Sequence, residues 1–204
     1  MTKFKSLLFI AVLVGFAGLA DAGFDEGKTA YDKGDYAIAY KEFRAAAEQG
    51  IAEALVFLGV MYAKGEGVRQ DYAEAVKWYH KAAKHGDAGA QWLLGVMYDN
   101  GQGVPQDYAE ALKWFRKAAE QGNAYAQYSL GVMCANGQGV QQDLVQAHMW
   151  FNLSAAQADA DARKYSDILE DARKYRDMLA KKMTPSQIAE AQRLAREWKP
   201  KGRD

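Results

Sequence analysis

The sequence has few of the residues that form disulfides, bind metals or interrupt helices. Its 204 residues include one cysteine, three histidines and three prolines. A single cysteine, Cys134, excludes an internal disulfide framework and a cysteine-rich zinc site. His80 and His85 lie five positions apart, so they do not share one helix face as a metal-binding pair would. We therefore expect no metal site and no cofactor.

The sequence also lacks a net charge. It holds 26 basic and 26 acidic residues, and half of its residues are apolar. A nucleic-acid partner requires a basic face on the protein, so we expect no nucleic acid to bind. The apolar share is too high for a disordered chain and is typical of a soluble globular protein.

Short catalytic motifs are absent as well. The sequence contains no GxSxG, HExxH, P-loop, GxGxxG or CxxC pattern, and no serine is followed three residues later by lysine. These patterns supply the nucleophiles, metal ligands and phosphate-binding loops of common enzymes, so we expect a protein without catalytic activity. The alternative from another class is a cell-envelope hydrolase that acts on cell-wall or β-lactam substrates.

The first 22 residues have the pattern of a signal peptide. Lys3 and Lys5 precede an apolar run over 7–19, and Ala20 and Ala22 are the small residues that a signal peptidase recognises. The run is shorter than the roughly 20 apolar residues of a membrane-spanning helix. We predict cleavage after Ala22, export to the periplasm or secretion, and no stable membrane insertion afterwards. An uncleaved anchor is the alternative.

Internal repetition is the strongest pattern in the rest of the chain. Segments 51–86, 87–122 and 123–158 align without gaps at a period of 36 residues. The period returns at aspartate, methionine and tryptophan positions: Asp35, Asp71, Asp107 and Asp143; Met61, Met97 and Met133; Trp78, Trp114 and Trp150. A period of this length indicates stacked repeat units, none of which buries a core alone.

Each 36-residue unit predicts two antiparallel helices. In the middle unit Ala90 and Leu94 follow helical spacing, and Gly101 follows as a C-terminal stop. Asp107 precedes the second helix as its N-cap, with Glu110 three residues later in the arrangement of a capping box. Capping accounts for the repeated aspartates better than an acidic site does. The second helix is predicted to bury Tyr108, Ala111, Leu112, Trp114, Phe115 and Ala118.

The two ends of the repeat region differ from its middle. Residues 23–50 predict one further helix pair, and residues 159–204 predict a long helix followed by a capping helix that begins at the capping box TPSQ. The decapeptide at 161–170 is followed directly by a near copy of itself. We predict one continuous helix from Ala160 to Lys182 that projects beyond the stack. An insertion that loops out without a role is the alternative.

The repeats share the motif LGVMY-xx-GxGV-x-QD-xxx-A-xx-W-[YF], which ends in AA-xx-G. It reads LGVMYAKGEGVRQDYAEAVKWY, LGVMYDNGQGVPQDYAEALKWF and LGVMCANGQGVQQDLVQAHMWF in the three units. The motif resembles that of the Sel-one-like repeat (SLR) family, relatives of the tetratricopeptide repeats. The resemblance implies an all-α fold, a right-handed α-solenoid of stacked antiparallel helix pairs, whose members mostly act as adaptors that bind other proteins. Cysteine-rich members described as β-lactamases depend on paired cysteines that this chain lacks. We expect an exported, monomeric adaptor that binds a protein or peptide partner.

The expected partner-binding groove lies along the first helix of each pair, which lines the concave face of tetratricopeptide-like stacks. Its outward positions are Val56, Val60 and Lys64; Trp92, Val96 and Asn100; Tyr128, Val132 and Asn136. The first pair would extend the groove with an acidic end formed by Asp25, Thr29 and Asp32. We expect Trp92 and Tyr128 to be exposed. The alternative is that these side chains only pack one repeat against the next.

Two residues in the predicted core have side chains that can react or bind metals, Cys134 and His148. Cys134 stands where the earlier repeats have tyrosine, and His148 stands where they have valine or leucine. We expect Cys134 to be a buried core residue, with an intermolecular disulfide as the alternative. We expect His148 to be packed and hydrogen-bonded rather than a metal ligand.

Overall fold

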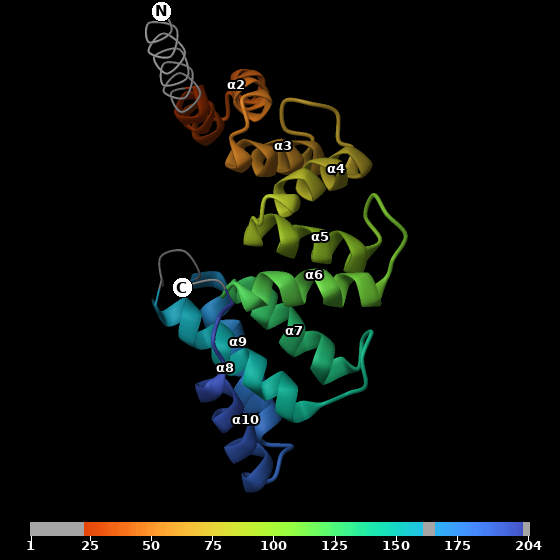
Figure 1. The fold of residues 1–204 in the computed structure, drawn as a ribbon, viewed down its shortest axis with the longest axis vertical. Coiled ribbons are helices and arrows are strands. Elements are labelled where there is room, and N and C mark those ends of the chain that lie inside the picture. The colour runs from red at the N-terminus through yellow and green to blue at the C-terminus, as the bar shows by residue number, and fades with distance from the viewer. Residues whose placement is uncertain (1–22, 161–165, 202–204) are drawn as a thin grey trace, which may run out of the picture. The chain divides into compact units, whose positions relative to one another are not determined.

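Every regular element in the described part of the chain is an α-helix (Figure 1). The computed structural model describes residues 23–160 and 166–201. The predicted signal peptide therefore lies outside the described residues. The chain divides into two compact units between Asp87 and Ala88, and each unit has its own buried core.

The first unit is a succession of short helices. Within the described residues they are a helix over 23–33, α2 (Tyr36–Glu48), α3 (Ala52–Lys64) and α4 (Tyr72–Lys84). α2 packs on α3 and α3 packs on α4, because a helix of this length is stabilised mainly by burying its apolar stripe against a neighbour. Phe43, Leu58 and Met61 are fully buried at the centre of this unit.

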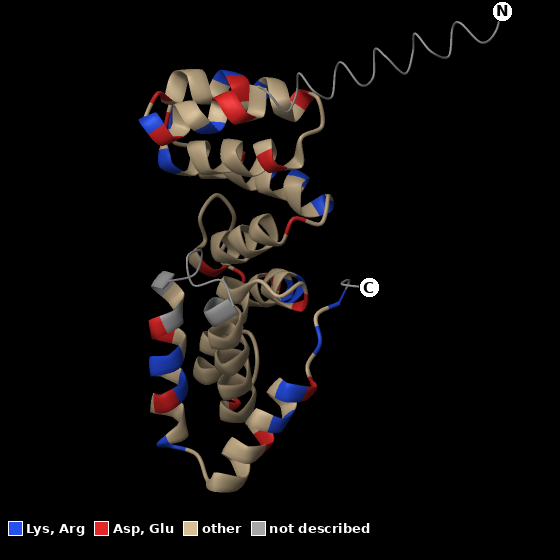
Figure 2. Ribbon diagram, turned by 90° about the vertical axis from the view of Figure 1, so that its left-hand side faces the viewer, with Lys and Arg blue, Asp and Glu red and all other residues tan. Residues whose placement is uncertain are grey.

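The second unit continues the same succession and then departs from it. Its described helices are α5 (Ala88–Asn100), α6 (Tyr108–Glu120), α7 (Ala124–Asn136), α8 (Leu144–Ala160), α9 (Ser166–Ala180) and α10 (Pro185–Glu197). From α5 to α8 each helix packs on the next, whereas α9 and α10 both pack on α8. Figure 2 shows that residues of both charge signs run along these last two helices. The end of the unit is thus covered by a partly polar surface, as a terminal repeat requires.

The two helices of each repeat cross closely at a glycine of the first helix. Gly95 on α5 faces Phe115 on α6, where a Cβ atom would come within 2.4 Å of the aromatic ring. Gly59 on α3 faces Tyr79 on α4 at the same separation. Both rings are almost completely buried. The ring of the second helix therefore fills the space that a side chain on the first helix would need.

The link between the two helices is held by the Gln-Asp pair of the repeated motif. The side-chain amide of Gln70 donates to a carbonyl near the end of α3 at 2.8 Å, and the backbone N–H of Asp71 donates to another at 2.9 Å. Gln106 and Gln142 make the equivalent side-chain bond in the next two repeats. Gly65 begins the first link with φ at 76°, a left-handed conformation that favours glycine. The motif therefore encodes the shape of the link.

The repeated aspartates are helix caps in three of the four cases. The carboxylates of Asp71, Asp107 and Asp143 accept backbone N–H bonds in the first turns of α4, α6 and α8. Asp35 precedes α2 without making a side-chain cap bond. The three bonded carboxylates satisfy N–H groups that would otherwise lack a partner at the helix ends, which is a structural role.

The prediction of a capping box at Asp107 is only half right. The backbone N–H of Asp107 donates to the carbonyl of Tyr98 across the link, so it does not bind the Glu110 carboxylate. Glu110 instead pairs with Lys113 at 3.0 Å. The complete capping box occurs at the start of α10, at the TPSQ segment where the sequence predicted it.

The core of α6 agrees with the predicted pattern except at two aromatic residues. Ala111, Ala118, Leu112 and Phe115 are buried as predicted, whereas Tyr108 and Trp114 are only half-buried. Both lie at the margins of the apolar stripe, where polar neighbours reach them. The Gln106 amide donates to the Tyr108 hydroxyl, and the Lys117 ammonium lies 4.3 Å from the centroid of the Trp114 ring.

The duplicated decapeptide continues as one helix across the junction of its two copies, since α9 runs from Ser166 to Ala180. Residues 161–165, where the predicted helix begins, lie outside the described residues. The prediction that this helix projects beyond the stack is wrong, because α9 packs on α8 and α7. Its side chains Ile168, Ala172 and Leu179 are buried. Burial of this apolar stripe stabilises the packed position over a projecting one.

The segment after α10 returns to the end of α6. The backbone N–H of Lys201 donates to the carbonyl of Glu120 at 2.7 Å, and its ammonium lies 2.9 Å from the Glu120 carboxylate. The carbonyls at the C-terminal end of a helix lack partners within the helix, so this contact satisfies one of them. It also places a positive charge at the negative end of the α6 dipole.

Candidate functional site

The predicted groove residues of the first unit lie along α3. Val56 and Val60 are half-buried, and Lys64 is exposed at the end of the helix. The Lys64 ammonium lies 3.6 Å from the Glu66 carboxylate and 6.0 Å from the centroid of the Tyr31 ring. On the helix over 23–33 the three residues of the predicted acidic end are exposed: Asp25, Thr29 and Asp32. The first unit therefore offers a mixed apolar and charged surface along this helix.

Trp92, the central residue of the predicted groove, is half-buried rather than exposed. Its ring stacks on Tyr125 of α7 with centroids 4.9 Å apart and an interplanar angle of 30°. Its indole N–H donates to the hydroxyl of Ser129 at 3.3 Å. Val96 packs against the same core between α6 and α7. At this position the side chains join one repeat to the next, as the alternative interpretation proposed.

Tyr128 is also half-buried, and α9 accounts for part of its contacts. Its ring lies edge-on to Phe151 of α8 and to Tyr175 of α9, with centroid distances of 5.4 and 5.8 Å. Burial, followed by the proximity of Tyr175 and Asp171, raises the pKa of the Tyr128 hydroxyl to about 12. Val132 packs against the core that includes α8. The C-terminal helices thus use much of the third repeat's predicted binding face.

The polar residues at the end of the predicted groove remain on the surface. Asn100 and Asn136 are exposed, and their amides contact the side chains of Gln102 and Gln138. These contacts repeat at the same place in consecutive links. Binding of a partner by any of the nine predicted groove residues stays a prediction.

The two chemically notable core residues are placed as expected. Cys134 is buried, and burial raises the pKa of its thiol, which makes the reactive thiolate less available. His148 is buried, with its Nδ1 atom 3.0 Å from the amide nitrogen of Asn152. Burial, followed by the charge of Arg176, lowers the pKa of the His148 imidazole. Both side chains are packed core residues.

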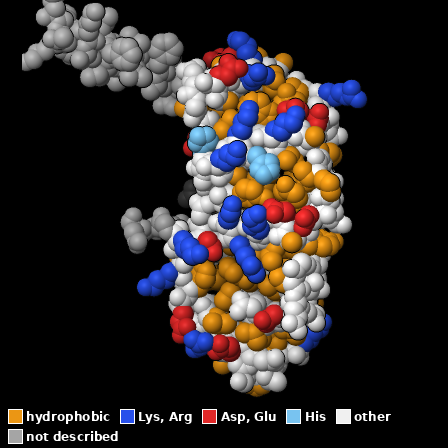
Figure 3. Space-filling model, turned by 45° about the vertical axis from the view of Figure 1, so that its right-hand side comes forward, with side chains coloured by type: hydrophobic (Ala, Val, Ile, Leu, Met, Phe, Trp, Pro, Cys, Tyr) orange, Lys and Arg blue, Asp and Glu red, His pale blue; other side chains and the backbone are white. Residues whose placement is uncertain are grey.

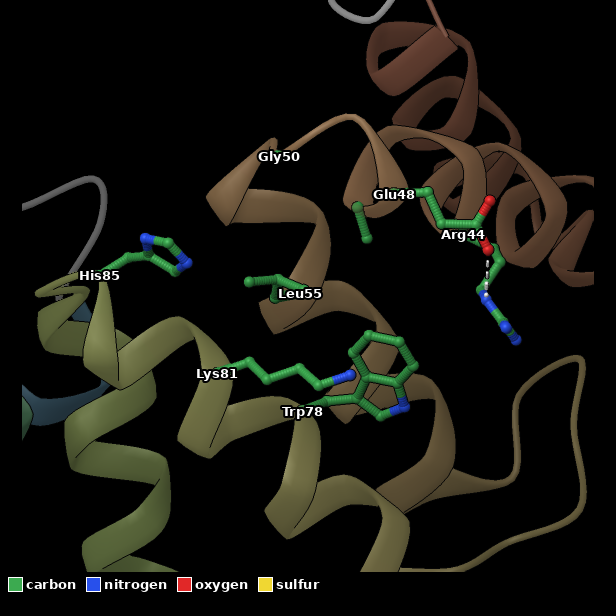
Figure 4. A pocket seen from close by; sticks show the side chains of 8 residues that line it. Arg44, Glu48, Gly50, Leu55, Trp78, Lys81 and His85 are labelled. Carbon is green, nitrogen blue, oxygen red and sulfur yellow. Dashed lines mark hydrogen bonds and ion pairs between the residues drawn. The ribbon is translucent and has the colours of Figure 1, made fainter.

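A hollow that the sequence analysis did not identify lies between α2 and α4. Its volume is about 350 Å³, and it is lined by Arg44, Ala47, Glu48, Gly50, Leu55, Trp78, Lys81 and His85 (Figure 4). We call this hollow the Trp78 pocket. The Lys81 ammonium lies 4.0 Å from the centroid of the Trp78 ring, and the Arg44 guanidinium carbon lies 6.0 Å from it. Two cations therefore border one half-buried indole.

The sequence contains a signal for this pocket that the assignment of tryptophan to the core concealed. A lysine three residues after a tryptophan lies over the same helix face, so Lys81 reaches the ring of Trp78. Lys117 repeats the arrangement over Trp114. In the third repeat Leu153 takes this position, and it is buried. A lysine at this position therefore marks an indole partly covered by a charged side chain, whereas a leucine at this position joins the core.

Another hollow, in the second unit, lies beside Trp150 near the start of α8, whereas the Trp78 pocket lies toward the end of α4. Its volume is about 290 Å³, and its lining residues are Leu112, Arg116, Leu130, Cys134, Val140, Gln141, Asp143, Gln146 and Trp150. Arg116 and Trp150 stand 72 positions, or two repeats, after Arg44 and Trp78. Figure 3 shows lysine, arginine and histidine side chains interspersed with hydrophobic ones on the face it presents. Both hollows therefore combine a guanidinium with an indole.

The described residues contain no group of three or more histidine, cysteine, aspartate or glutamate side chains placed to hold a metal ion. In that same part of the chain, none of the helices combines the length and apolarity needed to cross a membrane.

Comparisons with known proteins identify the repeats. The family model described as Sel1 repeat matches residues 52–87, 88–123 and 124–159, which together make up more than half of the chain. No curated protein sequence matches the chain.

Solved structures that share the fold include two that are also similar in sequence. One is a protective antigen present in uropathogenic Escherichia coli strains and displaying an SLR fold, which is 39% identical with a TM-score of 0.64 over 78% of this chain. The chain spans only 38% of that antigen's length. The other is a Sel1 repeat protein from Oxalobacter formigenes, 32% identical with a TM-score of 0.62, and the match covers 83% of this chain and 72% of that one. With its three matched repeats and its all-helical succession of packed pairs, the chain belongs to the Sel1 repeat family and has the α-solenoid fold of that family.

Proposed function

We propose that the protein is an exported, non-catalytic adaptor that binds a protein or peptide partner. Sel1 repeats form helical scaffolds that commonly mediate protein interactions, which makes this class of function the natural starting point. The observation that carries the proposal is that some residues of the repeat shape the fold, while others remain at the surface. The glutamine and aspartate of the motif hold the link, and its glycine permits the helix crossing.

The side chains left at the surface by this division are of the kind that binds partners. Lys64 is exposed and Val60 is half-buried on α3, and Trp78 is half-buried beside two cations on α4. Aromatic and arginine side chains in partly desolvated positions contribute most to protein interfaces. We propose that partner contacts form along those parts of the first helices that remain at the surface and that the free protein is a monomer.

Export is supported by the pattern of the first 22 residues. Its test is the intact mass of the protein recovered from the periplasm or the medium of an expressing bacterium. The expected mass is that of a chain beginning at Gly23. A recovered protein that keeps residues 1–22, or protein found only in the cytoplasm, would contradict export.

Partner binding is tested by selecting peptides from a displayed random library on the purified chain. The expected result is a set of peptides that bind saturably and more weakly to the Val60→Glu variant. Ala73→Glu is the matched control, because Ala73 is exposed on the second helix of the same repeat. Circular dichroism of both variants checks that they remain folded. Failure to enrich peptides above an unrelated helical-repeat protein would contradict the adaptor proposal.

A further inference from the structure

We propose that the Trp78 pocket binds the side-chain carboxylate of an acidic residue in a partner's peptide segment. The inference rests on the proposed adaptor function. It adds that the adaptor prefers negatively charged partner residues at this pocket. Most of the lining residues come from the second helices α2 and α4, and none of them is a groove residue that the sequence predicted on the first helices. Figure 4 shows Lys81 and Arg44 approaching the indole of Trp78 from different elements.

The first argument is that Lys81 supplies a cation without a partner carboxylate. Among the described residues no carboxylate lies within ion-pair distance of the Lys81 ammonium, which instead sits 4.0 Å from the centroid of the Trp78 ring. A cation over an indole face is attracted to the ring but keeps its N–H donors. Lys81 is therefore held in place and is able to donate to an incoming carboxylate.

The second argument is that Arg44 is bound weakly. Its Nε atom lies 3.1 Å from the Glu48 carboxylate, one helical turn away, and both side chains are about half exposed or more. Its Nη1 atom donates a long hydrogen bond of 3.3 Å to the Tyr40 hydroxyl, and this contact is also exposed to solvent. Exposed ion pairs between neighbouring turns contribute little to stability. A partner carboxylate can therefore replace Glu48 at little cost, and a guanidinium is well shaped to bind a carboxylate in a bidentate manner.

The third argument concerns the apolar part of the pocket. Leu55 is buried at its wall, and Gly50 at its edge has open space where a side chain would stand. The methylene groups of a glutamate fit against this apolar wall while its carboxylate faces the two cations.

The charges also favour a peptide carboxylate over a polyanion. The lining carries the charges of Arg44 and Lys81 against that of Glu48, so the surplus of fixed charge is small. A nucleic acid would need a continuous basic track, whereas the whole sequence has no net charge. A volume of about 350 Å³ accommodates one or two side chains of a peptide.

The experiment compares two peptide libraries on the purified full chain. Both have amidated C-termini and random flanks; one has glutamate at the central position and the other has glutamine. The wild-type protein is expected to retain the glutamate library at least about fivefold more strongly, the size of one charge-assisted hydrogen bond. Lys81→Gln and Arg44→Gln should each remove most of this preference.

The matched control is Lys117→Gln, because Lys117 lies over Trp114 in the same way but borders neither hollow's lining. This variant should keep the full preference for glutamate. Equal retention of both libraries by the wild type, or an equal loss in Lys117→Gln, would overturn the pocket while leaving the adaptor function intact. Displacement of the glutamate library by a single-stranded oligonucleotide at equal concentration would also overturn it. Retention of neither library would contradict both proposals, since the random flanks also test the groove.

Discussion

The helices α4 and α8 occupy the same place in their repeats, yet they use the same tryptophan differently. Trp78 on α4 has the Lys81 ammonium over its ring and borders an open pocket. Trp150 on α8 lies edge-on to Trp198, the residue after α10, with centroids 6.3 Å apart. Leu153 beside it is buried in the core that α8 shares with the C-terminal helices. Both indoles are half-buried, but one is covered by a lysine and the other by a tryptophan from the C-terminal segment.

The largest expected effect follows from the different side chains that pack over the two tryptophans. Trp150→Ala should lower the free energy of unfolding by about 3 kcal/mol, because it removes a ring packed against two core clusters. Trp78→Ala should cost about 1–2 kcal/mol, since its ring faces exposed charged side chains. Urea unfolding followed by circular dichroism measures both. Equal losses would mean that the two tryptophans contribute equally to the stability of the fold.

Exchanging the neighbouring residues sharpens the comparison. Leu153→Lys should lower the free energy of unfolding by about 2 kcal/mol, because the lysine must bring an ammonium into a closed apolar core. Lys81→Leu should change it by less than about 0.5 kcal/mol, because its side chain is exposed. The thermal midpoints of both variants report the difference. A destabilised Lys81→Leu variant would show that the cation over Trp78 is a structural contact.

A smaller effect is expected where α8 has His148 and α4 has Val76. Burial, followed by the charge of Arg176, lowers the pKa of His148 in the folded protein. The folded state then binds the proton less readily than the unfolded state does. The stability contributed by neutral His148 is complete above the unfolded pKa of about 6.5 and is lost as the pH falls below it.

The variant His148→Val gives α8 the residue of α4 and tests this dependence. Its unfolding free energy should decline less steeply than that of the wild type between pH 6.5 and pH 5, in urea titrations at each pH. The comparison of slopes removes the constant effect of the substitution on packing. Parallel slopes for the two proteins would show that another group is responsible for acid sensitivity.

The smallest effect is expected at the rim of the Trp78 pocket. Glu48→Gln removes the carboxylate that pairs with Arg44 on the protein surface. The thermal midpoint should move by no more than about 1–2 °C, because exposed pairs contribute little. Retention of the glutamate library should rise in the same variant. A large loss of stability would mean that Arg44 is not available to a partner.

The sequence predicted the parts of the fold that depend on local chemistry. The period fixed the helix pairs, three of the four aspartates cap helices, and Cys134 and His148 are buried where the pattern placed them. These outcomes follow from spacing along one or two helices. The signal peptide and the exported location stay predictions.

The sequence could not predict contacts that depend on distant segments. Trp92 stands at an outward position of its helix, but Tyr125 and Ser129 lie 33 and 37 residues later and meet it across the stack. The direction of α9 depended in the same way on whether α8 offered an apolar surface. The Trp78 pocket was missed because the repeated tryptophans were assigned to the core, although a lysine three residues after Trp78 indicates an indole partly covered by a charged side chain.

The position of α9 also limits how the protein can lengthen during evolution. By packing on α7 and α8, α9 occupies the apolar surface on which a further helix pair would stack. A repeat duplicated after residue 180 would find that surface already filled and would have to bury its own core alone. Duplications within residues 51–158 would instead insert between surfaces that already fit one another. Duplication within the repeat region is therefore easier to accommodate than duplication after residue 180.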